Sequence, residues 1–177
     1  MKTTLIIGGA RSGKSRLAQE MALNSGRDVL FVATAEARDG EMRRRIEEHR
    51  KMRPSGWTTL EATGQLGEQI ARNIGRSRTV VIDCVTLLVS NVFEEHAGSS
   101  DLEKEVMAEI EGIIDCTRQA EADFIIVTNE VGLGIIPGDR VSRLYRDILG
   151  RANQRLAVHA DEVLLLVAGI PVTIKKG

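Results

Sequence analysis

The sequence predicts an α/β fold in which a mostly parallel sheet is flanked by helices. Five short apolar runs recur along the chain, and each is continuous rather than alternating, which is typical of strands buried on both faces. Longer stretches with helical periodicity separate these runs, as expected for right-handed β–α–β crossovers. The chain has 177 residues and contains no repeat, low-complexity segment or interdomain linker, so we expect one domain spanning residues 1–177.

The expected strands can be placed in chain order. The five apolar runs are Thr4–Ile7, Val29–Ala33, Val80–Asp83, Phe124–Thr128 and Val163–Val167. A further run, Val172–Ile174, follows the last of these after a turn at Gly169-Ile170-Pro171. This final pair predicts an antiparallel hairpin that closes the sheet.

Helical periodicity is clearest in three stretches. The first follows the first strand and contains Leu17, Ala18 and Met21. In the second, Ser100 and Glu103 have the spacing of a capping box, and one apolar face is then kept by Leu102, Val106, Ile110, Ile113 and Thr117. A third apolar face is formed by Val141, Leu144, Tyr145, Ile148, Leu149, Ala152 and Leu156.

Composition and charge exclude several classes of protein. The formal net charge is −1, the pI is about 6.3 and aromatic residues make up 3%, which argues against a nucleic-acid binder. No signal peptide precedes the first strand, and no apolar stretch approaches the roughly 18 residues of a membrane helix. Cys84 and Cys116 offer neither a disulfide framework nor zinc spacing. We therefore expect a soluble cytoplasmic protein.

A phosphate-binding loop follows the first expected strand. Residues 8–15 fit the pattern G-x-x-x-x-G-K-[ST] without a gap, between that strand and a helical stretch. A glycine-rich turn that binds nothing would need neither neighbour, so the context favours a P-loop NTPase of the RecA-like type. Backbone N–H groups and the helix dipole would hold the phosphates. The loop consists of Gly8, Gly9, Ala10, Arg11, Ser12, Gly13, Lys14 and Ser15.

Individual side chains of this motif have expected roles. Lys14 would reach the β- and γ-phosphates, and the Ser15 hydroxyl would bind Mg²⁺. Asp83, which ends an apolar run, has the position of a Walker B aspartate and would be the second metal ligand; its alternative role is to cap the helix that follows. The segment Thr128–Val131 lacks the Asn-Lys-x-Asp pattern of regulatory GTPases, which makes a signalling GTPase improbable.

A basic segment surrounds one histidine. Residues 38–53 contain seven Lys and Arg against four Asp and Glu. In a helix, Met42, Ile46, His49 and Arg53 would share one stripe, and nearby cations would lower the pKa of His49 and keep it neutral and nucleophilic. A buried hydrogen-bonded histidine and a solvated basic face are the alternatives that composition alone favours.

Five groups of residues together resemble the bifunctional adenosylcobinamide kinase/adenosylcobinamide-phosphate guanylyltransferase family of cobalamin biosynthesis. They are Gly8–Ser15; Ala33–Ala35; Arg45, Ile46 and His49 with Arg53, Pro54 and Trp57; Thr128–Gly132; and Gly150, Arg151, Asn153 and Gln154. The resemblance covers nearly the whole chain.

The resemblance implies two reactions. ATP or GTP first phosphorylates the hydroxyl of adenosylcobinamide, and GTP then gives its guanylyl group to His49 with loss of pyrophosphate. The phosphate of adenosylcobinamide phosphate attacks that adduct to form adenosylcobinamide-GDP. The resemblance also implies a homotrimer. The nucleotide contacts that it implies are Gly8–Ser15, Ala33, Thr34, Ala35, Arg50, Lys51, Met52, Arg53, Glu61 and Asp83.

Glu61 has two possible roles. Its carboxylate could accept hydrogen bonds from guanine N1–H and the exocyclic amine, which adenine does not offer; otherwise it is a solvated glutamate at a strand end. The sequence departs from the family pattern at Ala35, where serine is common, and at Lys51-Met52, where a smaller or more polar pair is usual. These departures could shift nucleotide preference.

Two other functions compete with this interpretation. A monofunctional small-metabolite kinase of the shikimate or nucleoside-monophosphate type has a similar length and the same loop, but it would transfer only a γ-phosphate. A nucleotide-gated interaction module would need the loop without a nucleophile, and His49 argues against it. Labelling with α-³²P-GTP distinguishes the bifunctional enzyme from a simple kinase, because a simple kinase does not transfer the α-phosphate. GTP turnover that strictly depends on cobinamide would exclude the interaction module.

Overall fold

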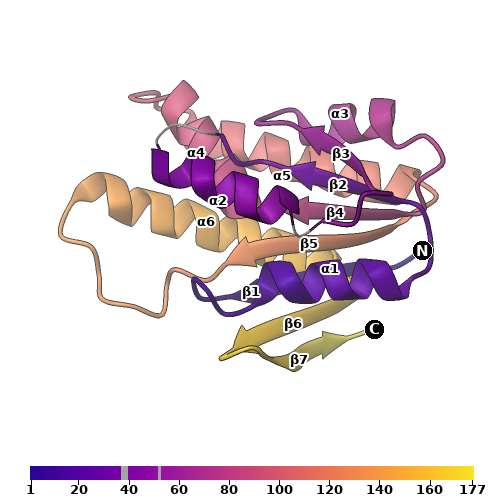
Figure 1. Ribbon diagram of the computed structural model, residues 1–177. Coiled ribbons are helices and arrows are strands. Elements are labelled where there is room, and N and C mark those ends of the chain that lie inside the picture. The colour runs from indigo at the N-terminus through magenta and orange to yellow at the C-terminus, as the bar shows by residue number, and fades with distance from the viewer. Residues whose placement is uncertain (37–39, 52) are drawn as a thin grey trace.

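The computed structural model describes residues 1–36, 40–51 and 53–177, and within residues 40–51 it leaves out the side chains of Glu41, Met42, Arg45, Glu48 and His49. The described residues form seven strands and six helices (Figure 1). Their order is β1 (Thr3–Gly8), α1 (Lys14–Asn24), β2 (Val29–Ala33), α2 (Gly40–Lys51), β3 (Thr58–Glu61), α3 (Leu66–Asn73), β4 (Thr79–Asp83), α4 (Val85–Glu95), α5 (Leu102–Gln119), β5 (Asp123–Asn129), α6 (Arg140–His159), β6 (Glu162–Val167) and β7 (Ile170–Lys176).

The seven strands form one mixed sheet in the order β3-β2-β4-β5-β1-β6-β7. All neighbouring strands are parallel except β6 and β7, which form the predicted antiparallel hairpin. This α/β architecture confirms the predicted fold class. Because β5 lies between β1 and β4, the strand that precedes the phosphate loop is separated from the strand that ends in Asp83 by one strand.

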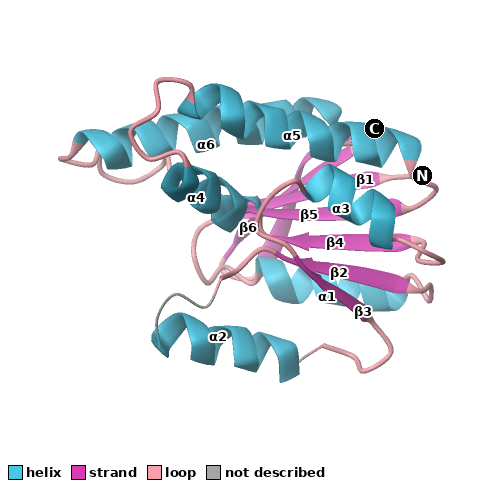
Figure 2. Cartoon of the chain, turned by 90° about the horizontal axis from the view of Figure 1, so that it is seen from above, coloured by secondary structure: helices cyan, strands magenta, loops and turns pink. Residues whose placement is uncertain are grey.

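Helices cover both faces of the sheet (Figure 2). Strand residues alternate between two cores, as the two-residue period requires. Leu5, Val80 and Ile82 belong to the core that also contains residues of α3, α4, α5 and α6. Ile6 and Val81 belong to a smaller core with α1. Burial on both faces explains why these strands are continuously apolar.

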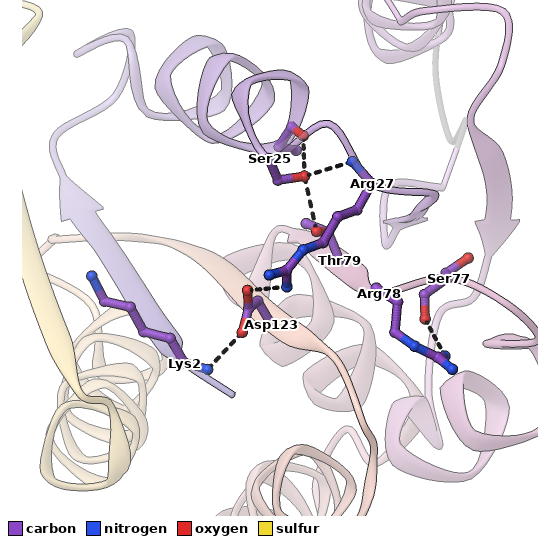
Figure 3. A network of polar contacts seen from close by, with 8 residues as sticks. Lys2, Ser25, Arg27, Ser77, Arg78, Thr79 and Asp123 are labelled. Carbon is purple, nitrogen blue, oxygen red and sulfur yellow. Dashed lines mark hydrogen bonds and ion pairs between the residues drawn. The ribbon is translucent and has the colours of Figure 1, made fainter.

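Polar contacts hold the sheet at the amino-terminal ends of its central strands (Figure 3). Asp123, at the start of β5, accepts hydrogen bonds from the backbone N–H of Lys2 at 2.7 Å and from Arg27 Nη1 at 2.8 Å. The hydroxyl groups of Ser25, after α1, and of Thr79, in β4, lie 3.1 Å apart. These contacts join the residues before β1 and after α1 to the starts of β4 and β5, at the end of the sheet opposite the phosphate loop.

Four sequence expectations are corrected by the structure. Strand β3 was not among the predicted runs because Thr58, Thr59 and Glu61 are exposed on an edge strand. Helix α5 is not started by a capping box: its N-cap is Asp101, with no side-chain cap, so the predicted box at Ser100 and Glu103 is wrong. The other two concern the buried face of α6 and the residue at which α2 ends.

Helix α6 does not bury its whole apolar face. Ile148, Leu149, Ala152 and Leu156 are buried as predicted, but Val141 is 68% exposed and Leu144 is 41% exposed. The loop before α6 is also apolar and exposed, with Ile135 at 97%. Figure 1 shows that this loop and the start of α6 extend past the end of the sheet, where the core no longer covers them. No helix among the described residues is both long enough and apolar enough to cross a membrane.

Helix α2 ends at Lys51, so Arg53 is not on the helical stripe that periodicity predicted. The remaining stripe positions Met42 and His49 lie in α2, but their side chains are outside the described part of the chain, as is all of Met52. Figure 2 shows α2 on the same side of the sheet as α1 and farther from the sheet.

Candidate active site

Parallel strands bring several predicted site residues to one edge of the sheet. Glu61 at the end of β3 and Asp83 at the end of β4 both pair with Ala33 at the end of β2. Asp83 in turn pairs with Val127 of β5, and Asn129 of β5 pairs with Gly8 of β1. The carboxyl ends of these strands therefore meet the phosphate loop, where α/β proteins bind ligands.

The phosphate loop has the backbone of an anion cradle. Gly13 has φ 98° and immediately precedes α1, whose N-terminus has no side-chain cap, and Arg11 has φ 56°. Left-handed residues in such a loop turn successive N–H groups toward one point. Lys14 is only 6% exposed, and its Nζ donates to the carbonyl of Gly9 at 2.6 Å. The lysine is thus held inside the loop.

Gly8 allows the loop to approach β6 closely. A Cβ atom at this position would lie 2.6 Å from the carbonyl oxygen of Leu166 and 2.9 Å from Ser12 Oγ. Any larger residue would push the start of the loop away from its neighbours. The glycine is therefore required by packing as well as by the loop's curvature.

A cavity of about 1310 Å³ opens in front of this loop. Its lining includes most of the residues implied as nucleotide contacts: Ala10, Arg11, Ser12, Gly13, Lys14, Ser15, Ala33, Ala35, Arg50, Arg53, Glu61 and Asp83. Gly8, Gly9, Thr34 and Lys51 are not part of the lining. Further lining residues that sequence reasoning did not single out are Arg16, Gln19 and Leu87; Gln19 lies one helical turn after Ser15. Asn129 also lines the cavity, and it belongs to the segment Thr128–Gly132 that contributed to the family resemblance without a role of its own.

Helix α2 also contributes to the wall of this cavity. Arg43, Arg44, Ile46, Glu47 and Arg50 all line it, so the basic segment faces the phosphate loop. His49 belongs to the same helix, while its side chain lies outside the described atoms. A helix that places four of its charged residues against a phosphate loop favours an anionic ligand between them.

Three buried polar atoms at this cavity have no hydrogen-bond partner among the described residues. They are Ser12 Oγ and the Nε and Nη1 atoms of Arg53. Burying a donor without a partner is costly, and both residues line the cavity. The oxygen atoms of a bound anion would satisfy these groups. This is the feature of the site that fits a nucleotide most directly.

Arg53 is positioned by an aromatic side chain rather than by α2. Its guanidinium carbon lies 4.0 Å from the centre of the Phe31 ring, and Trp57 stacks on Phe31 at 6.1 Å between ring centres. Burial lowers the pKa of Arg53 and the cation of Arg50 lowers it further, while the carboxylates of Asp83 and Glu61 act in the opposite direction. Arg53 remains a cation, because arginine is effectively always protonated.

Glu61 forms an ion pair with Arg50. Both side chains are about half exposed, 54% and 51%, so the pair contributes little to stability and can be opened by a ligand. The two residues, with Arg53 and Trp57, also line an adjoining cavity of about 350 Å³. Glu61 is therefore an accessible acceptor at the rim of the larger cavity.

Thr34 acts behind the cavity instead of lining it. Its hydroxyl donates to the carbonyl of Cys84 at 2.7 Å and accepts from the Cys84 N–H at 2.8 Å. Asn91 Nδ2 donates to the carbonyl groups of Thr34 at 3.0 Å and of Thr63 at 3.1 Å. These bonds join the ends of β2 and β4 to α4, and they hold Asp83 and Ala33 side by side.

Cys84 lines the cavity but is not a nucleophile at neutral pH. Burial raises the pKa of its thiol to about 11, with a further contribution from the charge of Asp83. The reactive form of cysteine is the thiolate. The thiol therefore stays protonated, which leaves covalent chemistry in this cavity to other side chains.

The oxygen ligands at this edge fit Mg²⁺. Ser15 and Asp83 line the same cavity, and Mg²⁺ prefers oxygen ligands, of which the protein supplies one or two and substrate phosphates and water supply the rest. Among the described residues, no group of three or more His, Cys, Asp or Glu could hold a metal ion without substrate. The N-cap residue of helix α4 is Cys84, the residue after Asp83. Asp83 therefore does not occupy the helix-capping position that was its alternative role.

Fold and site together define a P-loop nucleotide-binding protein: the phosphate loop joins a buried strand to a helix, and an acidic residue ends a nearby strand. The family model described as cobinamide kinase / cobinamide phosphate guanyltransferase matches residues 4–174. The chain belongs to this family.

Curated relatives match the chain over almost its full length. It is 43% identical over 179 residues to the bifunctional adenosylcobalamin biosynthesis protein CobU of Escherichia coli (strain K12), covering 97% of this chain and 98% of the relative. The CobU protein of Salmonella typhimurium is 40% identical over 179 residues, with the same coverage. The corresponding CobP protein of Pseudomonas aeruginosa is 40% identical over 171 residues, covering 97% and 96%. The family resemblance predicted from the sequence is confirmed.

Proposed function

We propose that this protein carries out two consecutive reactions of cobalamin biosynthesis in one cavity. It transfers the γ-phosphate of ATP or GTP to the hydroxyl of adenosylcobinamide, and it then transfers GMP from GTP to the resulting phosphate to give adenosylcobinamide-GDP and pyrophosphate. The supporting observation is that the phosphate loop and the arginine-rich helix α2 both line a single cavity.

In the kinase step, the acceptor oxygen forms a bond to the γ-phosphorus and the nucleoside diphosphate leaves with the electron pair of the broken bond. The chemistry needs positioning and neutralisation of charge more than covalent participation by the protein. Lys14 and the loop N–H groups would hold the β- and γ-phosphates. Mg²⁺ bound through Ser15 and Asp83 would supply further positive charge, and both side chains have oxygen atoms suited to it.

In the guanylyl step, an imidazole nitrogen of His49 attacks the α-phosphorus of GTP and pyrophosphate departs. A phosphate oxygen of adenosylcobinamide phosphate then attacks the phosphorus of the guanylyl-histidine, and the phosphorus–nitrogen bond breaks with its electron pair on the imidazole, which releases His49. An anionic α-phosphate is a poor electrophile until cations neutralise it. Arg50 and Arg53 line the cavity on the side of α2, and the unpartnered N–H groups of Arg53 suit that task.

Glu61 would select guanine in this second step. Its carboxylate lies at the rim, paired with an exposed arginine that a base can displace. Ala33, Ala35 and the backbone of residues 50–53, which includes Lys51 and Met52, complete the nucleotide contacts in this proposal.

The family resemblance also leads us to propose a homotrimer in the cytoplasm. Ile135 and Val141 are exposed apolar residues, in the loop before α6 and in its first turn, and surfaces of this kind are often covered by another subunit. Both cysteines are free thiols, which suits a reducing compartment. Light scattering during size-exclusion chromatography is expected to give three times the mass of the 19.4 kDa chain; a monomer would contradict the trimer.

The decisive experiment for the proposed function is incubation with adenosylcobinamide, GTP and Mg²⁺, followed by mass spectrometry of the corrinoid. We expect adenosylcobinamide-GDP together with pyrophosphate. A product that stops at adenosylcobinamide phosphate would instead identify a monofunctional kinase. GTP consumption that does not depend on the corrinoid would contradict both activities.

A further inference from the structure

Asn129 lines the large cavity, but the roles proposed for the phosphate loop and Asp83 give it no part in the reaction. It is the last residue of β5, the strand between β1 and β4. Its register partner is Gly8, where the phosphate loop begins, while Val127, two residues earlier, pairs with Asp83. Residues two apart on a strand face the same side, and both Val127 and Asn129 line the large cavity. Asn129 thus lies between the two phosphate-binding strands, on the ligand side.

The backbone around Asn129 is held from three directions. Its N–H donates to Thr86 Oγ1 at 2.7 Å, and its carbonyl accepts from Asn153 Nδ2 at 3.0 Å. The next N–H, of Glu130, donates to the carbonyl of Gly8 at 2.9 Å. Strand ends are free to fray, but here α4, α6 and β1 each fix one peptide group.

The residues that hold this strand end are themselves fixed. Asn153, which is buried in α6, accepts a hydrogen bond from the Thr128 hydroxyl at 2.7 Å. Tyr145 of α6 donates to the carbonyl of Thr86 at 2.9 Å, and it packs edge-on against Phe93 of α4 with 5.1 Å between ring centres. Such support fixes the backbone of Asn129 at the edge of the cavity that this residue lines, and a fixed backbone is one requirement of a preorganised site.

The chemistry of the carboxamide matches what lies beside it. Within the part of the chain that the structure describes, the hydrogen bonds that hold residue 129 use its backbone, so the side-chain amide is available to a ligand. The adjoining Gly9 carbonyl accepts the Lys14 ammonium at 2.6 Å, which locates the lysine charge near the same end of β1. An amide N–H donates to a phosphate oxygen without adding charge, whereas a carboxylate at this position would repel it.

We propose that the side-chain amide of Asn129 donates a hydrogen bond to the γ-phosphate of the bound nucleoside triphosphate and is a catalytic residue of the phosphoryl-transfer step. The inference rests on the proposed function for the identity of the acceptor. During transfer, the acceptor oxygen bonds to the γ-phosphorus, the β–γ bridging bond breaks with its electron pair on the diphosphate, and the acceptor proton passes to solvent. Asn129 exchanges no proton; it stabilises the charge on the transferred group.

Binding of two matched nucleotides tests this inference without any corrinoid. The ligands are GTP and GDP analogues with a methylene group between the α- and β-phosphorus atoms, titrated calorimetrically with Mg²⁺. In Asn129→Ala we expect triphosphate affinity to fall about tenfold or more, as for loss of a hydrogen bond to a charged group, while diphosphate affinity stays unchanged. Asn129→Asp, which is nearly isosteric, is expected to lose more because of charge repulsion.

The same substitutions at Asn73 provide a matched control. Asn73 is exposed at the end of α3, and Asn73→Ala and Asn73→Asp are expected to leave both affinities unchanged. Equal losses for the triphosphate and the diphosphate in both Asn129 variants would show that the residue only supports the loop and would overturn the inference. If Asn129→Ala keeps the wild-type preference for the triphosphate over the diphosphate, the inference is also overturned.

Kinase assays separate this inference from the proposed function. With adenosylcobinamide as acceptor, Asn129→Ala is expected to lower kcat and leave the KM of the corrinoid unchanged. If the wild-type protein does not phosphorylate adenosylcobinamide, the proposed function fails, yet dependence of triphosphate binding on Asn129 would still support the γ-phosphate contact. A wild-type kcat in a folded Asn129→Ala protein would overturn the catalytic role.

Discussion

The phosphate loop and helix α2 line one cavity but are built in opposite ways. In the phosphate half, formed by residues 8–15 with the ends of β4 and β5, Lys14 is 6% exposed and backbone groups are held by bonds to neighbouring elements. In the arginine half, formed by α2 with Arg53 and Glu61, the ion pair of Arg50 and Glu61 is about half exposed. Figure 2 shows α2 farther from the sheet than α1.

This difference suggests a division of labour. The phosphate half offers fixed N–H groups and the buried ammonium of Lys14, which suit phosphates common to every nucleotide and to both reactions. The arginine half offers the half-exposed charges of Arg50 and Glu61, which can change partners and so suit a base, a transient covalent adduct and a second large substrate. Substitutions in the first half should therefore damage both reactions, and those in the second half should separate them.

The largest expected effect is in the phosphate half. Lys14→Ala should abolish both activities, since one phosphate cradle serves both steps. Loss of a preorganised cation from a site of developing charge costs about 3–4 kcal/mol, or roughly a 10²–10³-fold loss of rate. Initial rates of phosphate and guanylyl transfer measure it, with Lys104→Ala on the exposed surface of α5 as the control. Normal kinase turnover in Lys14→Ala would show that phosphorylation uses another site.

A smaller and more selective effect is expected in the arginine half. Glu61→Gln should weaken discrimination between GTP and ATP in the guanylyl step by about 1.5–3 kcal/mol, because the amide presents one donor where guanine requires acceptors. Competition between the two nucleotides for adduct formation measures the change.

Glu68 gives a matched control for Glu61. It is also an exposed glutamate, paired with Arg72 at 2.8 Å, but it lies on α3, away from the cavity lining. Glu68→Gln is expected to leave the discrimination unchanged. If Glu61→Gln also leaves it unchanged, Glu61 does not read the base.

The smallest effect concerns Cys84, the residue after Asp83 at the end of β4. The pKa of Cys84 is raised to about 11, chiefly by burial, so the thiolate is scarce at pH 8 and iodoacetamide should react slowly. The rate should increase about tenfold for each pH unit toward pH 11, as the thiolate population does. Mass spectrometry of the native protein, with Cys84→Ser to assign the label, measures it. Rapid alkylation of Cys84 at pH 8 would indicate an open, solvated site.

Sequence reasoning was most successful where physical constraints are local. Continuous apolar runs identified β1, β2, β4, β5 and β6, because burial on both faces leaves no polar positions. The phosphate loop and Asp83 were likewise predicted, since a fixed spacing and a preceding strand define them. Edge strand β3 was missed because it is exposed and lacks such a run.

Features that depend on distant contacts could not be predicted in this way. Arg53 lies over Phe31, 22 positions earlier in the sequence, only because the fold brings them within 4.0 Å. Asn129 gains its place from the insertion of β5 between β1 and β4, which no local pattern encodes. The exposed first turn of α6 has the periodicity of a buried one, since periodicity does not reveal where a helix passes the end of the sheet.

The guanylyl-histidine intermediate is the central claim, and paired assays of His49→Ala test it directly. We predict that this variant loses the covalent GMP label from α-³²P-GTP and the synthesis of adenosylcobinamide-GDP but keeps kinase activity, because phosphoryl transfer needs no covalent intermediate. The wild-type label should be lost in acid and retained in base, as for a phosphoramidate. His96→Ala, at the end of α4, should behave as wild type.

Melting temperatures measured alongside distinguish a nucleophile from a core histidine, whose removal would lower both activities together with stability. The predicted result is an unlabelled His49→Ala protein with a nearly normal melting temperature and kinase rate. A His49→Ala protein that still carries label from α-³²P-GTP would contradict the assignment.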